Sequence, residues 1–419
     1  MTTCEVVSRK TYCSSRLSDS GSPAFRRSSF CQMIVFDINI DVFQELYMTE
    51  SNLPRRVLYQ FQVPDQAKRL GWKNEVFTGP CKDGQRPRYR LVRRILFPGW
   101  FCTLGWLTMP VLARRALRHC REFLGGRPEI GVFYSPYYLP ILKAIKPRIT
   151  VYHPIDDYTI YWPKRASRTL RLEDEMIRKA DLVVCTGRFM VDEFQQKYPD
   201  RADRIHHIPN PVTAKLIVPA PLPPTVFRGS GADARRPVLG YVGRIADRVY
   251  EPVIHALALE LPWADIKFAP VPGEMRQRAS QGLSNPFAAY SNVQILEDVP
   301  KAELTNLVRS FDACLLPQPA TRGNYCASPR KLWEYLASSR PIVTLNTPEA
   351  SVLEPYVHNA TSVEDFVGRV KSILAQGEPL DYPARRVSIA WDYTATPLAN
   401  RYAELLEKAR DRSGGVSPA

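Results

Sequence analysis

The residues best suited to chemistry lie in one segment of the C-terminal half, residues 328–337 (SPRKLWEYLA). Ser328 followed by Pro329 predicts an N-cap and the first helical residue, so a helix should begin there with free amides that favour an anion. Lys331 and Glu334 are three residues apart and share one face, whereas the leucines take the opposite, buried face. Such a cation and carboxylate could hold a phosphate and the neighbouring ribose diol. On this segment alone, an ordinary amphipathic helix with a solvated Lys–Glu pair is the alternative.

Two other segments should lie beside that helix. Residues 238–248 (VLGYVGRIADR) predict a strand that runs into a turn at Gly243, followed by Arg244 and Arg248, whose guanidinium groups could face the same phosphate. Residues 312–317 predict another strand, which ends just before the loop that leads to the helix. A strand followed by Gly and Arg is a weak signal alone. The three segments at these separations are far more specific, and together they predict a phosphate site.

These segments belong to a regular alternation of short β-branched runs and helical stretches, which predicts βα units and parallel sheets. Candidate strands lie at 34–38, 56–59, 130–134, 149–152, 181–185 and 205–208, and then at 238–242, 266–269, 293–296, 313–316 and 342–344. The prediction is an α/β protein of two Rossmann-like domains, with its ligand in the cleft at the carboxyl ends of the strands.

The domain boundaries follow from the breaks in this pattern. Residues 218–237 contain five prolines and a Gly-Ser-Gly, which indicates a linker. We therefore expect a disordered extension (1–32), an N-terminal domain (33–217), the linker (218–237), a C-terminal domain (238–390) and a C-terminal helical segment (391–419).

The composition narrows the partners and the compartment. The 57 Lys and Arg residues against 42 Asp and Glu give a net charge of +15, so an anionic partner is expected. Nine scattered cysteines without a Cys-x-x-Cys pair argue against a disulfide framework or a zinc site, and they fit a reducing cytosol. Nucleic acid is disfavoured, because the basic residues interleave with a long uncharged run and form no recognised nucleic-acid module.

That uncharged run, residues 95–113, predicts contact with a membrane. It is flanked by arginines and contains aromatic residues, which suits a surface that enters the headgroup layer of an anionic leaflet. Its prolines and glycines make it a poor straight span, and a buried helix pair with a solvated basic rim is the other alternative. The predicted membrane-contact residues are Arg94, Trp100, Phe101, Trp106, Arg114 and Arg115. A peripheral position on the inner face of the plasma membrane is therefore expected.

The chain resembles the GT-B class of glycosyltransferases, in particular the family-four-like bacterial enzymes that build surface polysaccharides such as teichuronic acid. The resemblance covers roughly residues 130–410 and is carried by 238–245 (VLGYVGRI), 292–317, 328–343 (SPRKLWEYLASSRPIV), 151–158 (VYHPIDDY), 173–186 and 208–212 (IPNPV). It implies an acceptor-binding N-terminal domain, a C-terminal domain that binds a nucleotide sugar, and a last helix that crosses back to the N-terminal domain.

The resemblance also assigns roles to the donor-site residues. Glu334 matches the second glutamate of the family's paired-glutamate motif, which hydrogen-bonds the ribose. Lys331, Arg244 and Arg248 match positions that neutralise the diphosphate, and Gly243 and Ser328 complete the predicted donor site. The chain departs from the pattern at Cys326, which stands where the first glutamate would be, and at Pro211, which follows Asn210 in place of the family's glycine. The design requires no metal and no cofactor.

The candidate catalytic residues follow the predicted strand 149–152. Asp156 is the candidate general base, because an inverting transfer needs a carboxylate to accept the proton of the acceptor hydroxyl. Asp157 lies beside it, and the alternative for both is that they cap the next helix. Similar enzymes place an aspartate or a histidine at this strand end, so His153 is a second candidate, although a structural histidine is at least as good a reading.

The function expected from all of this is that of a hexosyltransferase-type enzyme (EC 2.4). It would transfer a sugar from a nucleotide-sugar donor to a lipid-linked or other saccharide acceptor in polysaccharide or exopolysaccharide biosynthesis for the cell envelope. The alternatives are a non-catalytic GT-B-like binding protein, in which Cys326 marks a decayed donor site, and a sugar-nucleotide epimerase or phosphorylase-like enzyme of the same fold.

Overall fold

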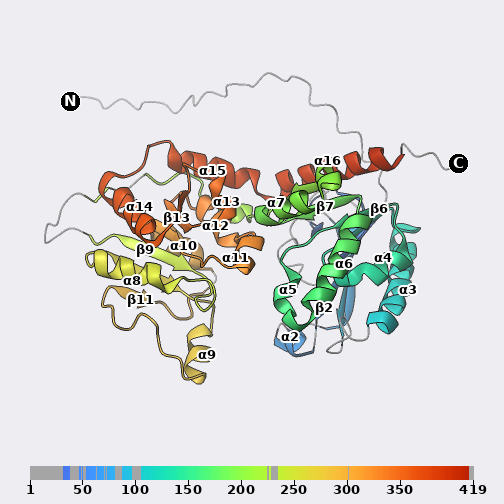
Figure 1. The fold of residues 1–419 in the computed structure, drawn as a ribbon, viewed down its shortest axis with the longest axis horizontal. Helices are drawn as coiled ribbons and strands as arrows, with labels where there is room; N and C mark the ends of the chain where they lie inside the picture. Colours follow the sequence, from blue (N-terminus) through green and yellow to red (C-terminus); the bar gives the residue numbers. More distant parts are fainter. Residues whose placement is uncertain are drawn as a thin grey trace, which may run out of the picture.

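Two sheets, one in each half of the chain, form the framework of the molecule (Figure 1). The computed structural model describes residues 32–37, 47–48, 50, 53–62, 64–69, 71, 73–80, 87–96, 105–223, 226–227, 235–300 and 302–414. The predicted N-terminal extension up to residue 31 and part of the predicted linker therefore lie outside the described residues.

The N-terminal sheet has the strand order β3-β4-β2-β1-β5-β6-β7-β8. Its strands are β1 (Met33–Asp37), β2 (Arg56–Gln62), β3 (Glu75–Pro80), β4 (Pro87–Ile95), β5 (Ile130–Phe133), β6 (Ile149–Tyr152), β7 (Leu182–Cys185) and β8 (Ile205–His207). Neighbouring strands pair in parallel, except that β3 and β4 are antiparallel. The accompanying helices are α2 (Pro64–Arg69), α3 (Gly105–Leu124), α4 (Leu139–Ile145), α5 (Tyr158–Tyr161), α6 (Ala166–Lys179) and α7 (Arg188–Lys197).

The C-terminal sheet is parallel throughout, with the order β11-β10-β9-β12-β13-β14. Its strands are β9 (Val238–Val242), β10 (Asp265–Ala269), β11 (Val293–Ile295), β12 (Ala313–Leu316), β13 (Ile342–Leu345) and β14 (His358–Ala360). Its helices are α8 (Glu251–Glu260), α9 (Glu274–Ser280), α10 (Leu304–Ser310), α11 (Arg322–Cys326), α12 (Arg330–Ala337), α13 (Pro348–Ser351), α14 (Val363–Gln376) and α15 (Tyr382–Asp392).

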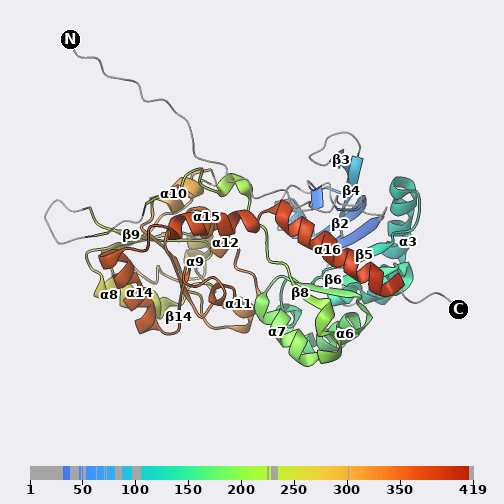
Figure 2. The same cartoon turned by 90° about the horizontal axis from the view of Figure 1, so that it is seen from above.

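The last helix returns to the N-terminal half, as the resemblance implied. Helix α16 (Ala395–Gly414) follows α15 almost directly, and Figure 2 shows the two helices lying end to end across both halves. Leu398, Tyr402 and Leu406 of α16 are buried in one cluster with strand residues of the N-terminal sheet. The opposite face of that sheet packs against α3, α4, α6 and α7, so helices cover both of its faces.

Every predicted strand has an observed counterpart, but β3, β4 and β14 were not predicted. Strand β4 (PRYRLVRRI) was not recognised as a strand because four of its nine residues are arginines. These arginines find partners on neighbouring elements: Arg90 lies 2.9 Å from Glu122 of α3, and Arg93 lies 2.6 Å from Glu75 of β3. A run of arginines that the sequence assigned to the rim of a membrane segment is thus partly built into a sheet.

Candidate active site

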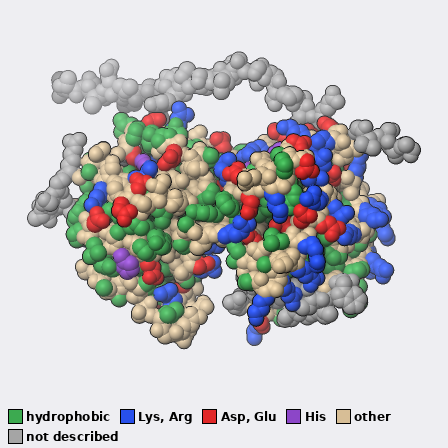
Figure 3. Space-filling view, in the orientation of Figure 1, with side chains coloured by type: hydrophobic (Ala, Val, Ile, Leu, Met, Phe, Trp, Pro, Cys, Tyr) green, Lys and Arg blue, Asp and Glu red, His purple; other side chains and the backbone are tan. Residues whose placement is uncertain are grey.

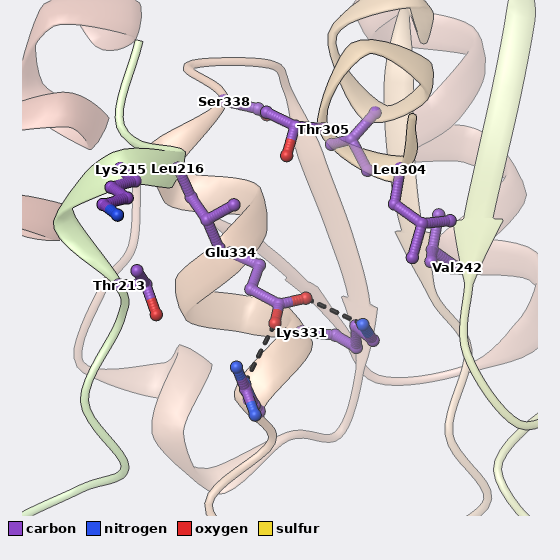
Figure 4. A pocket seen from close by; sticks show the side chains of 11 residues that line it. Thr213, Lys215, Leu216, Val242, Leu304, Thr305, Lys331, Glu334 and Ser338 are labelled. Atoms are coloured by element: carbon purple, nitrogen blue, oxygen red, sulfur yellow. Dashed lines mark hydrogen bonds and ion pairs between the residues drawn. The ribbon is translucent and has the colours of Figure 1, made fainter. Parts of the chain in front are cut away.

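A cavity of about 460 Å³ lies against the exposed face of α12 (Figure 4). Leu304, Thr305 and Val242 stand on one side of it, Thr213, Lys215 and Leu216 on the other, and Glu334 points into the space between them. The second group belongs to the segment between β8 and β9, and Leu216 of this segment packs against the core cluster of the C-terminal half. Its charged lining consists of Lys215, Arg330, Lys331 and Glu334.

Glu334 is held at the cavity by two cations of its own helix. Its Oε2 lies 2.7 Å from Lys331 Nζ and its Oε1 lies 3.0 Å from Arg330 Nε. The Glu334 side chain is only 19% exposed, which is more enclosed than a freely solvated surface pair. Lys331 and Glu334 therefore share one face, as predicted, while Leu332 and Leu336 are buried on the other.

The predicted cap of this helix is wrong by one residue. Pro329 is the N-cap of α12, and no side chain makes a capping hydrogen bond there. The hydroxyl of Ser328 instead accepts hydrogen bonds from the indole of Trp333 at 3.0 Å and from the backbone amide of Asn210 at 3.3 Å. Ser328 is thus occupied in joining the two halves, with a second bond from Asn210 Nδ2 to its carbonyl at 2.8 Å.

The turn after β9 lies next to α12. Gly243 has a φ of 139°, a backbone conformation that favours glycine, and a β-carbon there would lie 3.4 Å from Lys331 Cε and from Tyr241 Oη. The carboxylate of Glu274 fixes the turn by accepting the backbone amides of Ile245 and Ala246 at 2.8 and 2.9 Å. Gly243 thereby lies beside Lys331, whereas Arg244 and Arg248 are not among the residues that line the cavity.

The two predicted phosphate arginines share one carboxylate partner, Asp247. Arg244 lies 2.6 Å from Asp247, and Arg248 lies 3.8 Å from the same carboxylate. Arg248 also donates to the side-chain oxygen of Asn324 at 2.5 Å. Sequence reasoning missed Asn324, since nothing in its local pattern connects it with an arginine 76 positions away.

Asp156 and Asp157 play different parts. Tyr161 donates a 2.6 Å hydrogen bond to Asp156, and burial raises the pKa of Asp156 while Tyr161 and Arg248 oppose that rise. Asp157 caps α5 by accepting from the backbone amide of Thr159 at 2.8 Å, and its other oxygen accepts from Arg322. Burial acts to raise the pKa of Asp157, but the bonds from Thr159 and Arg322 outweigh it and lower the pKa. The capping alternative thus holds for Asp157, and Asp156 is the carboxylate next to Arg248.

His153 lies in the packed core instead of at the cleft. It is fully buried, with its ring stacked on Tyr134 at 4.4 Å and tilted against Tyr402 of α16 at 5.7 Å. Burial lowers the pKa of His153 to about 3. The structural reading of this histidine therefore fits its surroundings, and the structure does not bring it together with Asp156 at the cleft.

The predicted membrane residues are only partly described. Trp100, Phe101 and the side chain of Trp106 lie outside the described residues, whereas Arg114 and Arg115 are exposed on α3 and Arg94 is half-buried on β4. Helix α3 itself is amphipathic: Met109, Leu112, Ala116 and Cys120 face the core. Within the described ranges, every helix is too short or too polar to cross a bilayer.

Several residues that line the cavity were not predicted from the sequence. Arg330 was in reach, because it stands four residues before Glu334 on the same helix. Thr213 and Lys215 could not be found, since only the packing of the segment after β8 on the C-terminal core brings them to α12. Among the described residues no group of His, Cys, Asp and Glu has the makings of a metal site, and the metal-free design stays a prediction.

Comparison with known proteins places this architecture. Residues 65–216 match the model of Glycosyltransferase Family 4. The chain is 24% identical over 223 residues to TuaH of Bacillus subtilis (strain 168), which is named for a glycosyltransferase role in teichuronic acid biosynthesis. That match covers 52% of this chain and 54% of TuaH, so the chain spans about half the length of the curated relative it matches.

Solved structures match over most of the chain. HepE of Anabaena in complex with UDP is 15% identical, with a TM-score of 0.59 over 90% of this chain and 100% of that one. A glycosyltransferase from Rickettsia africae gives a TM-score of 0.64 at 10% identity, over 91% of this chain and 99% of that one. A UDP-forming trehalose-phosphate synthase from Burkholderia xenovorans gives 0.60 at 10% identity, over 91% and 99%. The predicted fold is confirmed by these likenesses.

Proposed function

We propose that this chain, which is a family-four-like protein of the GT-B fold, is a glycosyltransferase of the hexosyltransferase type (EC 2.4) that uses a nucleotide-sugar donor. The observation that carries the proposal is the cavity at α12, where Glu334 stands between Arg330 and Lys331. A carboxylate that accepts from two ribose hydroxyls beside cations that attract a diphosphate is the arrangement that a nucleotide sugar requires.

The shape and charge of the cavity support this donor class. Its volume of about 460 Å³ is in the range of small-molecule sites, and its three cations exceed its one carboxylate. Leu304 and Val308 provide an apolar wall for a base, while Thr305 offers a hydroxyl. HepE, a protein of the same fold, was solved with UDP and with UDP-glucose, which makes uridine nucleotides the first probes to use.

The reaction would proceed by displacement at the anomeric carbon. The acceptor hydroxyl oxygen forms the new bond to that carbon, the bond from the carbon to the diphosphate oxygen breaks, and the nucleoside diphosphate leaves with the electron pair. Asp156 accepts the hydroxyl proton, and a raised pKa makes it a better base. Arg244, Arg248 and Lys331 stabilise the charge that develops on the leaving diphosphate.

Calorimetry of the full chain tests this proposal. UDP, GDP, ADP, CMP and their common sugar conjugates are titrated into the protein, and we expect one nucleotide family to bind with a micromolar Kd. Glu334→Ala should weaken that binding at least tenfold, because the ribose loses its acceptor. Glu260→Ala is the matched control, since Glu260 pairs with Lys371 at 2.7 Å on α8, away from the cavity. A well-folded protein that binds no nucleotide would instead favour the non-catalytic reading, in which Cys326 replaces a donor contact.

We also propose a lipid-linked acceptor in cell-envelope polysaccharide or exopolysaccharide biosynthesis, reached from the cytoplasmic face of the plasma membrane. Support comes from the exposed face of α3, where Leu107 and Val111, 56% and 46% exposed, lie in line with Arg114, Arg118 and Arg121. Apolar residues beside arginines on one helical face suit an anionic leaflet. Figure 3 shows that Lys and Arg side chains are denser over the N-terminal half than over the C-terminal half on this side of the molecule.

Vesicle flotation tests the membrane proposal. We expect the protein to float with vesicles that contain anionic phospholipid and to stay in solution with purely zwitterionic ones. Arg114→Glu with Arg118→Glu should abolish flotation, because each residue contributes about 1 kcal/mol near such a surface. Arg276→Glu with Lys371→Glu makes the same charge change on the C-terminal half and should leave flotation intact. Equal loss in both pairs would reduce the attraction to net charge and remove α3 as the contact face.

A further inference from the structure

The short helix α11 touches both parts of the proposed reaction site. It belongs to the C-terminal half, where the hydroxyl of Thr321 accepts the backbone amide of Asn324 at 3.3 Å and so caps it. In Figure 1 it lies at the centre of the molecule, beside α7 of the N-terminal half. Two of its polar residues contact residues at or beside the groups that the proposed function uses: Arg322 contacts Asp157, and Asn324 contacts Arg248.

Arg322 reaches across to the loop that carries the aspartates. Its Nη1 and Nη2 each lie 2.8 Å from an oxygen of Glu193 on α7, which is a bidentate pair. Its Nε donates to Asp157, the residue next to Asp156. Asp157 is therefore fixed from two directions, by the amide of Thr159 within its own half and by Arg322 from the other half.

Asn324 faces the opposite way, towards the phosphate arginines. Its side-chain oxygen accepts from Arg248 at 2.5 Å, and its side-chain nitrogen donates to the carbonyl of Pro319 at 2.9 Å. Asn324 is only 5% exposed, so it has little freedom to turn away. The amide thereby sets the position of Arg248, whose charge also reaches Asp156.

The apolar residues of α11 pack against the N-terminal half. Cys326 is fully buried in the core cluster of that half, and the ring of Tyr325 lies 5.5 Å from that of Phe189 on α7. A β-carbon on Gly187 would come within 2.1 Å of the Cys326 carbonyl oxygen, so the two backbones are nearly in contact. The position that matches the family's first glutamate is thus used for packing between the halves.

We propose that α11 couples the two halves of the reaction site, with Arg322 positioning the aspartate loop and Asn324 positioning Arg248. The proposal rests on the proposed function, since it assigns these residues to a donor site and a proton acceptor. It separates their effects: Arg322 acts on turnover through Asp157, and Asn324 acts on donor affinity through Arg248.

The charges around Asp156 predict a shift in pH dependence. Asp156 faces Tyr161, Arg248 and Asp157, and the negative charge of Asp157 acts to raise the pKa of Asp156. Arg322 neutralises Asp157, so its removal should raise the pKa of Asp156 further. A general base must be deprotonated, and activity that is lost as the pH falls would therefore be lost at a higher pH in a variant without Arg322.

The test compares four variants of the full chain, with UDP-glucose as the probe and UDP release to water as the measured turnover. Arg322→Gln should lower kcat at least tenfold, leave the Kd for UDP within threefold and move the acidic limb of kcat to higher pH. Arg322→Lys should recover part of kcat. Asn324→Asp should weaken UDP binding at least tenfold, because a carboxylate would compensate the charge of Arg248. Asn324→Ser, which removes the side-chain amide without adding a charge, should weaken UDP binding less than Asn324→Asp does, and circular dichroism checks that both variants are folded.

Two matched controls decide whether Arg322 acts through Asp157 or only ties the halves together. Glu193→Gln removes the bidentate partner and leaves Asp157 paired, so kcat should stay within threefold of the wild type. Arg178→Gln breaks an exposed pair with Asp174 at 3.0 Å and should change nothing. If Glu193→Gln lowers kcat as much as Arg322→Gln does, or if Arg322→Gln behaves like Arg178→Gln, the proposal is wrong.

Hydrogen exchange separates failure of this inference from failure of the proposed function. Wild-type protein that neither binds nucleotides nor releases UDP would overturn the proposed function alone. The coupling is then read without substrate: Arg322→Gln should increase amide exchange over 155–161, and Asn324→Ser should increase it over 243–249. Unchanged exchange in both segments would overturn the coupling whatever the enzyme turns over.

Discussion

At the scale of single residues, Asp156 is the group on which the proposed chemistry depends most. Its carboxyl group is half-buried, and this desolvation raises its pKa, while Tyr161 and Arg248 favour the ionised form. Asp157 beside it has a lowered pKa because hydrogen bonds outweigh the effect of its burial. The environments of the two neighbours therefore shift their pKa values in opposite directions, which is the pattern expected of one acid–base group and one structural group.

Replacing Asp156 by Asn tests this assignment. Turnover should fall by about 10²–10⁴-fold, which is the usual contribution of a general base, while UDP affinity stays within threefold. In the wild type, kcat should decline as the pH drops through the raised pKa of Asp156, and the variant should lose that limb. Asp200→Asn is the control, since Asp200 is exposed on the surface of the same half. Near-normal turnover in Asp156→Asn would exclude this residue as the base.

The sequence predicted the residues whose partners lie close in the chain. Lys331 and Glu334 share a helical face because three residues separate them, and a helix makes such pairs neighbours. The role of Ser328 was mispredicted because its hydroxyl finds partners in Trp333 and in Asn210, and the latter lies 118 positions away. Local pattern cannot reveal a partner that only the packing of two halves supplies.

At the scale of elements, α16 is the helix that ties the C-terminal end of the chain to the N-terminal sheet. Leu398 is fully buried in the cluster that α16 shares with the strands. Leu398→Ala should lower the free energy of unfolding by about 2–5 kcal/mol, the range for a leucine truncated in a core. Lys408→Ala, on the exposed face of the same helix, should change it by less than about 0.5 kcal/mol. Urea unfolding followed by circular dichroism measures both, and equal midpoints would mean that α16 is not docked.

Elements with a clear hydrophobic pattern were predicted well. Elements whose residues also fit a charged surface were not. The strands β5, β6 and β7 are buried at every position and consist mainly of apolar residues, which marks them in the sequence. Strand β4 instead contains four arginines among its nine residues, and two of them, Arg90 and Arg93, pair with Glu122 and Glu75 from elsewhere in the fold. Read alone, that pattern indicates a basic surface, because its neutralising partners are not visible in the segment itself.

At the scale of the whole molecule, a buried carboxyl group lies between the two halves. Glu349 of α13 is 1% exposed, and its Oε1 accepts the backbone amide of Arg188 at the start of α7 at 2.8 Å. Its Oε2 has no hydrogen-bond partner in the part of the chain that the structure describes. Burial raises the pKa of Glu349 from 4.5 to about 7, although Arg188 opposes the rise.

This raised pKa predicts that the interface between the two halves weakens as the pH rises. The pKa of Glu349 is higher when the two halves are in contact than when they are apart. Glu349 therefore stabilises the contact fully below about pH 4.5, and this contribution is lost as the pH rises through about 7. We expect the radius of gyration, measured by small-angle scattering, to be larger at pH 8.5 than at pH 5.5. Glu349→Gln keeps the acceptor without the charge and should stay compact at both values. A variant that opens with pH as the wild type does would rule out Glu349 as the responsible group.

The backbone of Gly187 nearly touches the carbonyl of Cys326. The spacing between the two halves at this point therefore depends on the absence of a side chain at residue 187. A single methyl group at this position would act as a spacer between the two halves, and it would leave the other residues of both halves unchanged. Gly187→Ala is therefore a simple way to prepare a form in which the two halves are held permanently apart. Such a form would admit bulky or immobilised acceptors for capture, at the cost of the alignment that transfer needs.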